Sequence, residues 1–449
     1  MSTKLIHARY VVPVRPQGVV LENYGVVICD DVICEVLPVA EAKTAWPDAE
    51  LIDLSDHLLI PGLVNAHTHA PMTLLRGYAD DMDLPVWLRE HIWPAEREFV
   101  GPEFVTDGTR LAIAEMLRSG TTCFNDMYFF ADSAIEVCLE AGMRASIGIT
   151  IIEIESAWAT DVESYIEKGL ALHDRWKSEP LISFTLSPHA PYTVSDETLD
   201  RIAELSAGRG LPVHMHLLET EWEIKQSMQQ HDLHPLNRLE LRKLFNNRLQ
   251  AVHMTQLSNE DIDRLASSGV HVIHCPQSNL KLASGICPLH SVLRAGVNVA
   301  LGTDGAASNN DLDLLAEAQT AALLAKGISG DAESAPAFQV LEMMTINGAQ
   351  ALGLEERIGS IEVGKQADLC ALNLNFPETQ PVHNVVSQLV YAASSRQVSD
   401  VWVAGKQLLA EGALTTIDLD AVLDSARKWQ ARLAGMEQNK PNALKESDQ

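Results

Sequence analysis

Two shortages in the 449-residue sequence exclude whole classes of partner. Basic residues are few: 33 Lys and Arg stand against 61 Asp and Glu, so the formal net charge is −28. Proteins bind nucleic acid and anionic membrane surfaces through Lys and Arg, so we expect neither as a partner. Long apolar runs are also missing, since none approaches the roughly 18 residues of a membrane-spanning helix. The first residues lack the pattern of a secretory signal. We therefore expect a soluble, cytoplasmic protein.

Cysteine is scarce and shows no recognisable spacing. The seven cysteines, at positions 29, 34, 123, 138, 275, 287 and 370, form no C-x-x-C pair, and most lie within apolar runs. This distribution is typical of buried free thiols in a reducing compartment. We therefore expect all seven to be free.

Apolar residues make up 46% of the chain, and its length exceeds the usual limit of a single domain. Residues 1–58 and 361–415 contain short alternating segments rich in Val and Ile, which is typical of a small antiparallel β unit. Over residues 59–360, eight apolar runs alternate with helical stretches. The runs are Leu59–Val64, Thr121–Asn125, Arg144–Thr150, Leu181–Ser187, Leu211–Leu217, Leu249–Val252, Val270–His274 and Val297–Gly302.

This alternation predicts the α/β class: a (β/α)8 barrel of the TIM type over residues 59–360, with a small β-sandwich built from both chain termini. A C-terminal helix is expected over residues 416–436, followed by a polar tail over residues 437–449.

Titratable side chains follow six of the eight predicted strands. They are His67 and His69, His189, His214 and His216 with Glu219, His253, His274, and Asp304. Barrels of this class carry their active sites at the C-terminal ends of the strands, so these side chains should meet. Core packing favours apolar residues there, which makes a purely structural explanation a poor one.

Four of these residues suit a metal ion. Residues two apart on a strand share a face, so His67 and His69 project together. With His216 and Asp304 they predict one divalent metal, with a position left for water. His214 shares its strand face with His216, but we favour His216 because Glu219 follows it closely. His214 then lies behind a ligand or in the core.

The remaining residues have roles that their positions suggest. Glu219 lies just beyond a ligand, where a carboxylate can reach both the water and the substrate, so it is the candidate general acid and base. His253 is expected to polarise or hold the water, and His189 to contact the substrate. His274 either lines the pocket or supports another site residue.

Several motifs resemble the amidohydrolase superfamily. They are Pro61-Gly62-Leu63-Val64-Asn65-Ala66-His67-Thr68-His69, His216-x-x-Glu219, His253 and Gly302-Thr303-Asp304-Gly305. More narrowly, the chain resembles the 5-methylthioadenosine/S-adenosylhomocysteine deaminases of that superfamily, over essentially its whole length. The motifs of this narrower resemblance are Trp87, Trp93-Pro94-Ala95-Glu96, Ser187-Pro188-His189, Pro276-x-Ser278-Asn279-x-Lys281 and Ala306-Ala307-Ser308-Asn309. No Lys lies at the end of the fourth strand, where two-metal members carry a bridging carbamylated lysine. The resemblance therefore implies one metal ion per subunit, with zinc expected.

The resemblance also implies an activity: hydrolytic deamination of adenine nucleosides, converting 5′-methylthioadenosine, and more weakly S-adenosylhomocysteine or adenosine, to the inosine analogue and ammonia. Asp304 would take a proton from the attacking water, and Glu219 would protonate the ring nitrogen beside C6. The implied substrate contacts are Trp87, Glu96 (at the ribose hydroxyls), His189, Glu219, Asp304 and Ser308. Members of this family commonly associate, so a homodimer or homotetramer is expected.

Three other functions fit parts of the pattern. An aminohydrolase of the same fold acting on guanine, cytosine or a triazine would share the metal site without needing Trp87 or Glu96. A ring-opening amidohydrolase of the dihydropyrimidinase kind is disfavoured by the missing lysine. An inactive scaffold is disfavoured because it should have lost metal ligands, whereas this chain has the full set.

The stretch Gly148–Trp158 bears on the choice of nucleoside. Some relatives place arginines there that can grip the carboxylate of the homocysteine tail, but this stretch contains no Arg or Lys and carries Glu153 and Glu155. Loss of an arginine–carboxylate pair removes a strong contact. The sequence therefore predicts a preference for methylthioadenosine over S-adenosylhomocysteine of about tenfold or more. The alternative is a carboxylate contact from Arg76, Arg89 or a neighbouring subunit.

Overall fold

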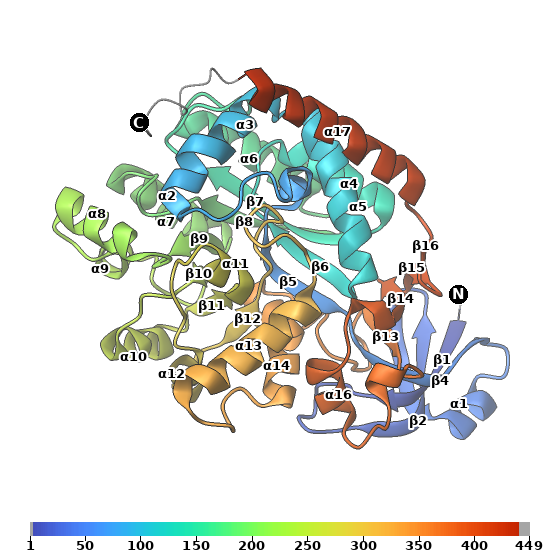
Figure 1. Cartoon of the computed structure of the whole chain (residues 1–449). Helices are drawn as coiled ribbons and strands as arrows, with labels where there is room; N and C mark the ends of the chain where they lie inside the picture. The colour runs from blue at the N-terminus through green and yellow to red at the C-terminus, as the bar shows by residue number, and fades with distance from the viewer. Residues whose placement is uncertain (1–2, 440–449) are drawn as a thin grey trace, which may run out of the picture.

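The computed structural model describes residues 3–439 and is built around eight parallel strands, hydrogen-bonded in the order β12-β11-β10-β9-β8-β7-β6-β5 (Figure 1). The strands are β5 (Leu63–Thr68), β6 (Thr121–Asp126), β7 (Arg144–Ile151), β8 (Ile182–Pro188), β9 (Val213–Leu217), β10 (Leu249–His253), β11 (His271–His274) and β12 (Val299–Leu301). Just past β12, the backbone N–H of Asp304 donates to the carbonyl of His67 over 3.1 Å, which ties the last strand to the first. The predicted (β/α)8 barrel is thereby confirmed.

The helices after the strands cover the outside of the barrel (Figure 1). Several begin at a side-chain cap and end at a left-handed glycine, as α7 does at Ser195 and Gly210. They are α4 (Pro102–Arg118), α5 (Ala131–Ala141), α6 (Val162–Trp176), α7 (Asp196–Arg209), α8 (Glu221–His231), α9 (Pro235–Leu241), α10 (Asn259–Ser268), α11 (Pro276–Lys281), α12 (Leu289–Arg294), α13 (Leu314–Ser329), α14 (Ala337–Met344) and α15 (Ile346–Ala351). The long connection after β5 folds into short helices: η1 (Ala70–Leu75), α2 (Leu84–Val86), η2 (Trp87–Ile92) and α3 (Trp93–Phe99).

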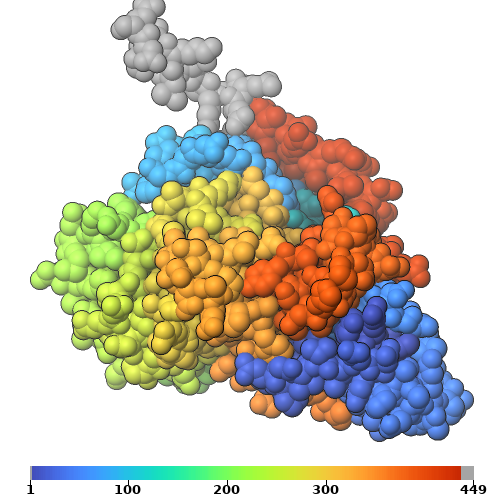
Figure 2. Space-filling model, turned by 60° about the horizontal axis from the view of Figure 1, so that its bottom comes forward, coloured from blue at the N-terminus to red at the C-terminus, as the bar shows by residue number. Residues whose placement is uncertain are grey.

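A second, eight-stranded sheet is assembled from the two ends of the chain in the order β16-β15-β14-β13-β4-β1-β2-β3. Its strands are β1 (Thr3–Val11), β2 (Leu21–Cys29), β3 (Val32–Pro38), β4 (Glu50–Pro61), β13 (Leu369–Asn373), β14 (Val398–Val403), β15 (Lys406–Ala410) and β16 (Ala413–Leu414). Figure 2 shows the N-terminal segments, in blue, beside C-terminal segments, in orange, at one end of the molecule. The sheet is mixed rather than purely antiparallel, because the chain crosses over through α1 (Val39–Ala45) and β4 then pairs parallel to β1.

The remaining helices lie in the C-terminal part of the chain. They are η3 (Pro377–Thr379), α16 (Val385–Tyr391), η4 (Ser395–Gln397) and α17 (Leu419–Asn439). Helix α17 packs along α4, where Trp429 Nε1 donates to Asp107 Oδ2 over 2.9 Å. The helix includes residues 437–439 of the predicted tail, and the rest of that tail lies outside the described residues. The domain boundaries drawn from the sequence stay a proposal.

The predicted first barrel strand, Leu59–Val64, proves to be parts of two strands. Its first half belongs to β4 of the second sheet, and β5 begins only at Leu63. The chain passes between the sheets at Gly62, where a Cβ would lie 2.1 Å from Thr122 Oγ1. Both strands are buried at this point, so the apolar run is continuous and its pattern cannot reveal the change of sheet.

The expectation of seven free thiols is wrong for two of them. Cys29 and Cys34 form a disulfide, with a Cα–Cα distance of 6.0 Å. They lie at the turn between β2 and β3, and this hairpin brings them within bridging distance. The other five cysteines are free and buried. Among residues 3–439, no helix is long and apolar enough to cross a membrane.

A buried ion pair joins the barrel to the second sheet. Arg144, at the start of β7, places its Nε 2.8 Å from Asp368 Oδ2 and its Nη2 3.0 Å from Asp368 Oδ1. Both side chains are almost completely buried, and Nη1 of Arg144 donates to the carbonyl of Pro180. A buried charge is tolerated only when it is paired and fully hydrogen-bonded. Burying either residue without the other would therefore lower the stability of the fold.

We therefore expect Asp368→Ala to lower the free energy of unfolding by about 3–5 kcal/mol, because it leaves the Arg144 guanidinium buried without its partner. Denaturant-induced unfolding followed by circular dichroism measures the change. The matched control is Glu140→Ala, which removes an exposed partner of Arg110 and should cost no more than about 1 kcal/mol. Equal losses in the two variants would contradict this prediction.

Candidate metal centre and active site

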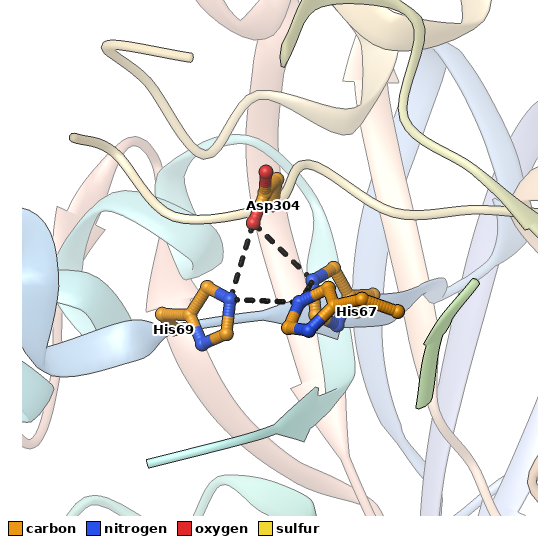
Figure 3. A group of neighbouring side chains, drawn as sticks. His67, His69 and Asp304 are labelled. Atoms are coloured by element: carbon orange, nitrogen blue, oxygen red, sulfur yellow. Dashed lines mark hydrogen bonds and ion pairs between the residues drawn. The ribbon is translucent and has the colours of Figure 1, made fainter. Parts of the chain in front are cut away.

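The four predicted metal ligands meet at the C-terminal end of the barrel. His67 lies in β5, His69 directly follows that strand, His216 lies in β9, and Asp304 follows β12. One ligand atom from each lies within 4.8 Å of those from the other three. Figure 3 shows the His67 and His69 rings and the Asp304 carboxylate pointing toward one another.

The spacing of these atoms fits a divalent metal ion. His216 Nε2 lies 3.3 Å from Nε2 of both His67 and His69, and Asp304 Oδ1 lies 3.2 and 3.3 Å from the same two nitrogens. Donor atoms that each lie about 2.0–2.1 Å from one zinc ion are about 2.8–3.4 Å apart at angles of about 90–109°, a range that includes five-coordinate sites with a position for water. The donor set of three imidazoles and one carboxylate is likewise of the kind that zinc accepts.

The hydrogen bond that each imidazole makes on the side away from the cluster determines which of its nitrogens has a lone pair for a metal ion. His69 Nδ1 lies 2.6 Å from the carbonyl of Met127, and His216 Nδ1 lies 2.7 Å from the carbonyl of His189. A carbonyl only accepts, so in both rings Nδ1 carries the proton and Nε2 offers its lone pair to the cluster. His67 Nδ1 instead contacts a side chain, His214 Nε2, at 2.7 Å.

Asp304 is held as a carboxylate. Burial alone would raise its pKa, but its contacts with His67 and His69 outweigh burial and hold the pKa well below its usual range. Its Oδ2 accepts from Ser278 Oγ (2.6 Å) and Ser308 Oγ (2.8 Å). Ser308, predicted to contact the substrate, therefore faces Asp304, and Ser278 joins it in orienting that carboxylate.

Glu219 lies beside this cluster and is 5% exposed. Its Oε2 is 3.7 Å from His253 Nε2, and its Oε1 accepts from Ser284 Oγ over 3.1 Å. Burial raises the pKa of Glu219, with the charge of His253 opposing the rise. A carboxyl group with a raised pKa can hold and deliver a proton, as a general acid must.

Sequence reasoning missed a second glutamate behind Glu219. Glu223 is buried, and its two carboxylate oxygens accept from the backbone N–H groups of Leu218 (2.9 Å) and Glu219 (3.0 Å). Burial raises the pKa of Glu223 to about 8. The signal was the Thr220-x-x-Glu223 spacing of a capping box, since Thr220 caps α8.

His253 and His274 have different surroundings. The His253 ring stacks on that of His216, and its Nδ1 lies 2.8 Å from Asn279 Oδ1, so it faces both the ligand cluster and Glu219. His274 is buried, and its Nδ1 has no hydrogen-bond partner among residues 3–439.

A cavity of about 650 Å³ opens beside the cluster. It is lined by His69, His189 and Glu96, and by apolar side chains that include Trp93, Phe130 and Trp158.

Two polar side chains of this wall, Glu96 and His189, have pKa values shifted by burial. Glu96 accepts from the Tyr128 hydroxyl over 2.7 Å, and burial raises the pKa of Glu96. Burial and the neighbouring histidine cluster lower the pKa of His189 to about 3, so His189 is neutral. A largely apolar pocket with a carboxyl group and a neutral imidazole on its wall suits an uncharged, hydroxyl-bearing aromatic ligand.

Trp87 is not part of this cavity wall. Its ring is 6% exposed in a buried apolar cluster, and its Nε1 donates to the carbonyl of Ala79 over 3.0 Å. The indole N–H of Trp87 thereby stabilises the connection after β5, while Trp93 and Trp158 line the cavity.

Comparisons with known proteins agree with this geometry. The family model described as "Amidohydrolase family" matches residues 58–408. Proteins named 5-methylthioadenosine/S-adenosylhomocysteine deaminase from Teredinibacter turnerae and Saccharophagus degradans are 49% and 46% identical to this chain, over 95% and 96% of it and 97% and 96% of their own lengths. A solved structure described as an adenosine deaminase from Xanthomonas campestris with bound zinc is 51% identical, with a TM-score of 0.95 over 97% of this chain and 99% of that one. The chain therefore belongs to the amidohydrolase family, among the relatives of the 5-methylthioadenosine/S-adenosylhomocysteine deaminases.

Proposed function

We propose that the protein deaminates adenine nucleosides by hydrolysis. It converts 5′-methylthioadenosine, and more weakly S-adenosylhomocysteine or adenosine, to the inosine analogue and ammonia. The observation that carries this proposal is the buried carboxyl of Glu219, which lies beside four converging ligand atoms. One of these ligands, His69, also lines a cavity that has Glu96 on its wall. The deaminases named above are about half identical to this chain over nearly its whole length, and their names support adenine nucleosides as the substrate class.

One zinc ion per subunit is proposed at His67, His69, His216 and Asp304. When bound, the ion makes a nucleophilic hydroxide available near neutral pH and acts as a Lewis acid. The donor set and its spacing support zinc, as does the zinc in the Xanthomonas campestris structure.

Asp304 and Glu219 each carry out a different proton transfer, and His253 positions the water. Asp304, a carboxylate, takes a proton from the attacking water, and His253 orients that water toward C6 of the adenine ring. Glu219 gives its proton to the ring nitrogen beside C6, which makes C6 more electrophilic. The water oxygen bonds to C6 as its proton passes to Asp304. Asp304 then gives that proton to the amino group, the C6–N bond breaks and ammonia leaves, while the new C6 hydroxyl returns a proton to Glu219 and becomes the carbonyl of the inosine product. Glu96 accepts hydrogen bonds from the ribose hydroxyls, and His189 contacts the base.

Ammonia release measured with methylthioadenosine, S-adenosylhomocysteine, adenosine, guanine and cytosine tests this function. We expect turnover with the three adenine nucleosides only. Preferred turnover of guanine or cytosine would favour a different aminohydrolase of the same fold. A homodimer or homotetramer remains a proposal from the family resemblance, and a cytoplasmic location remains a proposal from the composition of the sequence.

We predict that methylthioadenosine is preferred over S-adenosylhomocysteine by about tenfold or more in kcat/KM, a ratio that needs only about 1.4 kcal/mol. Glu155 lines the cavity, and Glu153 accepts from Ser195 N–H and Thr198 Oγ1 at the start of α7. Residues 152–158 include no Lys or Arg, so this stretch offers no cation to a carboxylate. A methylthio group needs only the apolar wall.

The measurement is kcat/KM for both nucleosides under identical conditions. Arg97 also lines the cavity, so Arg97→Ala serves as the comparison variant. Equal values in the wild type, or a preference for S-adenosylhomocysteine, would overturn the prediction. A selective loss for S-adenosylhomocysteine in Arg97→Ala would then assign the carboxylate contact to Arg97.

A further inference from the structure

A row of buried polar groups lies behind His67, on the side of its ring opposite the ligand cluster. His67 Nδ1 is 2.7 Å from His214 Nε2, His214 Nδ1 is 2.8 Å from Gln250 Oε1, and Gln250 Nε2 donates to the carbonyl of Ala351 over 2.8 Å. The side chains come from β5, β9 and β10, the carbonyl belongs to the last residue of α15, and His67, His214 and Gln250 are completely buried. Because bulk solvent does not reach these side chains, each proton in the row has a fixed place.

The direction of the row follows from its far end. The Ala351 carbonyl can only accept, so the Gln250 amide must present its nitrogen there and its oxygen to His214. That oxygen also only accepts, so His214 carries its proton on Nδ1 and has a lone pair on Nε2. This lone pair accepts the Nδ1 proton of His67, which leaves His67 Nε2 free to bind a metal.

Asn125 completes the arrangement from β6. Its Nδ2 lies 2.9 Å from Gln250 Oε1 and 3.2 Å from the carbonyl of Ala66, so each of its two hydrogens has an acceptor. It also lies 2.8 Å from His214 Nδ1. If His214 accepted from Asn125 there, its Nε2 would carry the proton, and His67 would have to hold its own proton on Nε2. In that state His67 cannot be a ligand.

We propose that His214 and Gln250 are positioning residues that hold His67 in its metal-binding tautomer. The Ala351 carbonyl fixes the orientation of the Gln250 amide. The inference rests on the metal site of the proposed function. His69 and His216 need no such row, because backbone carbonyls accept from them directly. His67 lies deeper in the barrel, where the carbonyls of neighbouring strands bond within the sheet, so a side chain has to supply the acceptor.

The first test is metal affinity, measured on the purified full-length protein by competition with a chelator of zinc. Gln250→Met removes the acceptor of His214, and His214→Leu removes the acceptor of His67. Each should weaken zinc binding about 10–100-fold, the usual cost of losing such a support. His214→Gln should restore most of the affinity, because its amide oxygen can accept from His67. The matched control is His271→Leu, a buried histidine of β11 that contacts Asn247 and Asn298 instead.

Unchanged affinity in Gln250→Met and His214→Leu would overturn the proposal, and so would an equal loss in His271→Leu. Nitrogen-15 NMR of labelled histidines in the wild type gives an independent answer even if a variant fails to fold. We expect the His214 proton on Nδ1, moving to Nε2 in Gln250→Met, and a wild-type His214 protonated on Nε2 would overturn the proposal. Wild-type protein that binds no zinc would instead refute the proposed metal site, which distinguishes the two failures.

Discussion

Glu219→Gln should lower kcat by about 10²–10⁴-fold while the zinc content stays at the wild-type level, because the variant loses only a proton donor. Glu219 is buried beside His253 and accepts from Ser284, and no ligand atom of the metal cluster belongs to it. A glutamine has nearly the same shape and can keep the Ser284 contact, but it cannot deliver a proton to the ring nitrogen.

Steady-state kinetics with methylthioadenosine, together with elemental analysis of the same preparations, measure both halves of this result. Glu221→Gln is the matched control: it lies two residues away, at the start of α8, where its exposed carboxylate pairs with Lys225. It should keep wild-type turnover. Near-normal turnover in Glu219→Gln would show that another group carries the proton.

His216→Ala should remove zinc and activity together. His216 Nε2 lies 3.3 Å from both His67 Nε2 and His69 Nε2, so its loss opens one side of the cluster and leaves only three donor residues. His173→Ala, a change at a partly exposed histidine of α6 beside Arg209, should leave both unchanged.

Elemental analysis and ammonia release on the same samples make this comparison. A His216→Ala protein that keeps its zinc and its turnover would contradict the ligand set. Two tightly bound metal ions per active wild-type chain would contradict the mononuclear assignment.

The amino-acid sequence by itself determined which residues would meet. A parallel barrel brings the C-terminal ends of all its strands to one face, so polar residues at those ends must gather there however far apart they lie in the chain. The side chains of His67 and His69 are two residues apart, so they point to the same face of the strand. This alternation is a local property that the sequence alone specifies. The position of Glu219 after His216 followed from the same strand-end rule.

Only the tertiary structure decided what lies against each residue. Whether Trp87 or Trp93 lines the cavity depends on how the connection after β5 packs, and whether Ser308 faces a ligand or a substrate depends on the carboxylate beside it. The disulfide of Cys29 and Cys34 and the change of sheet at Gly62 likewise depend on contacts across strands.

His214 shows the difference most clearly. Strand alternation places it on the same face as His216, and nothing local says which of the two binds a metal. Its acceptor, Gln250, and the carbonyl of Ala351 that orients Gln250 are 36 and 137 residues away along the chain, counted from position 214 to positions 250 and 351. Periodicity reports the direction of a side chain, whereas a proton's position depends on its hydrogen-bond partners, and those partners are brought together only by folding.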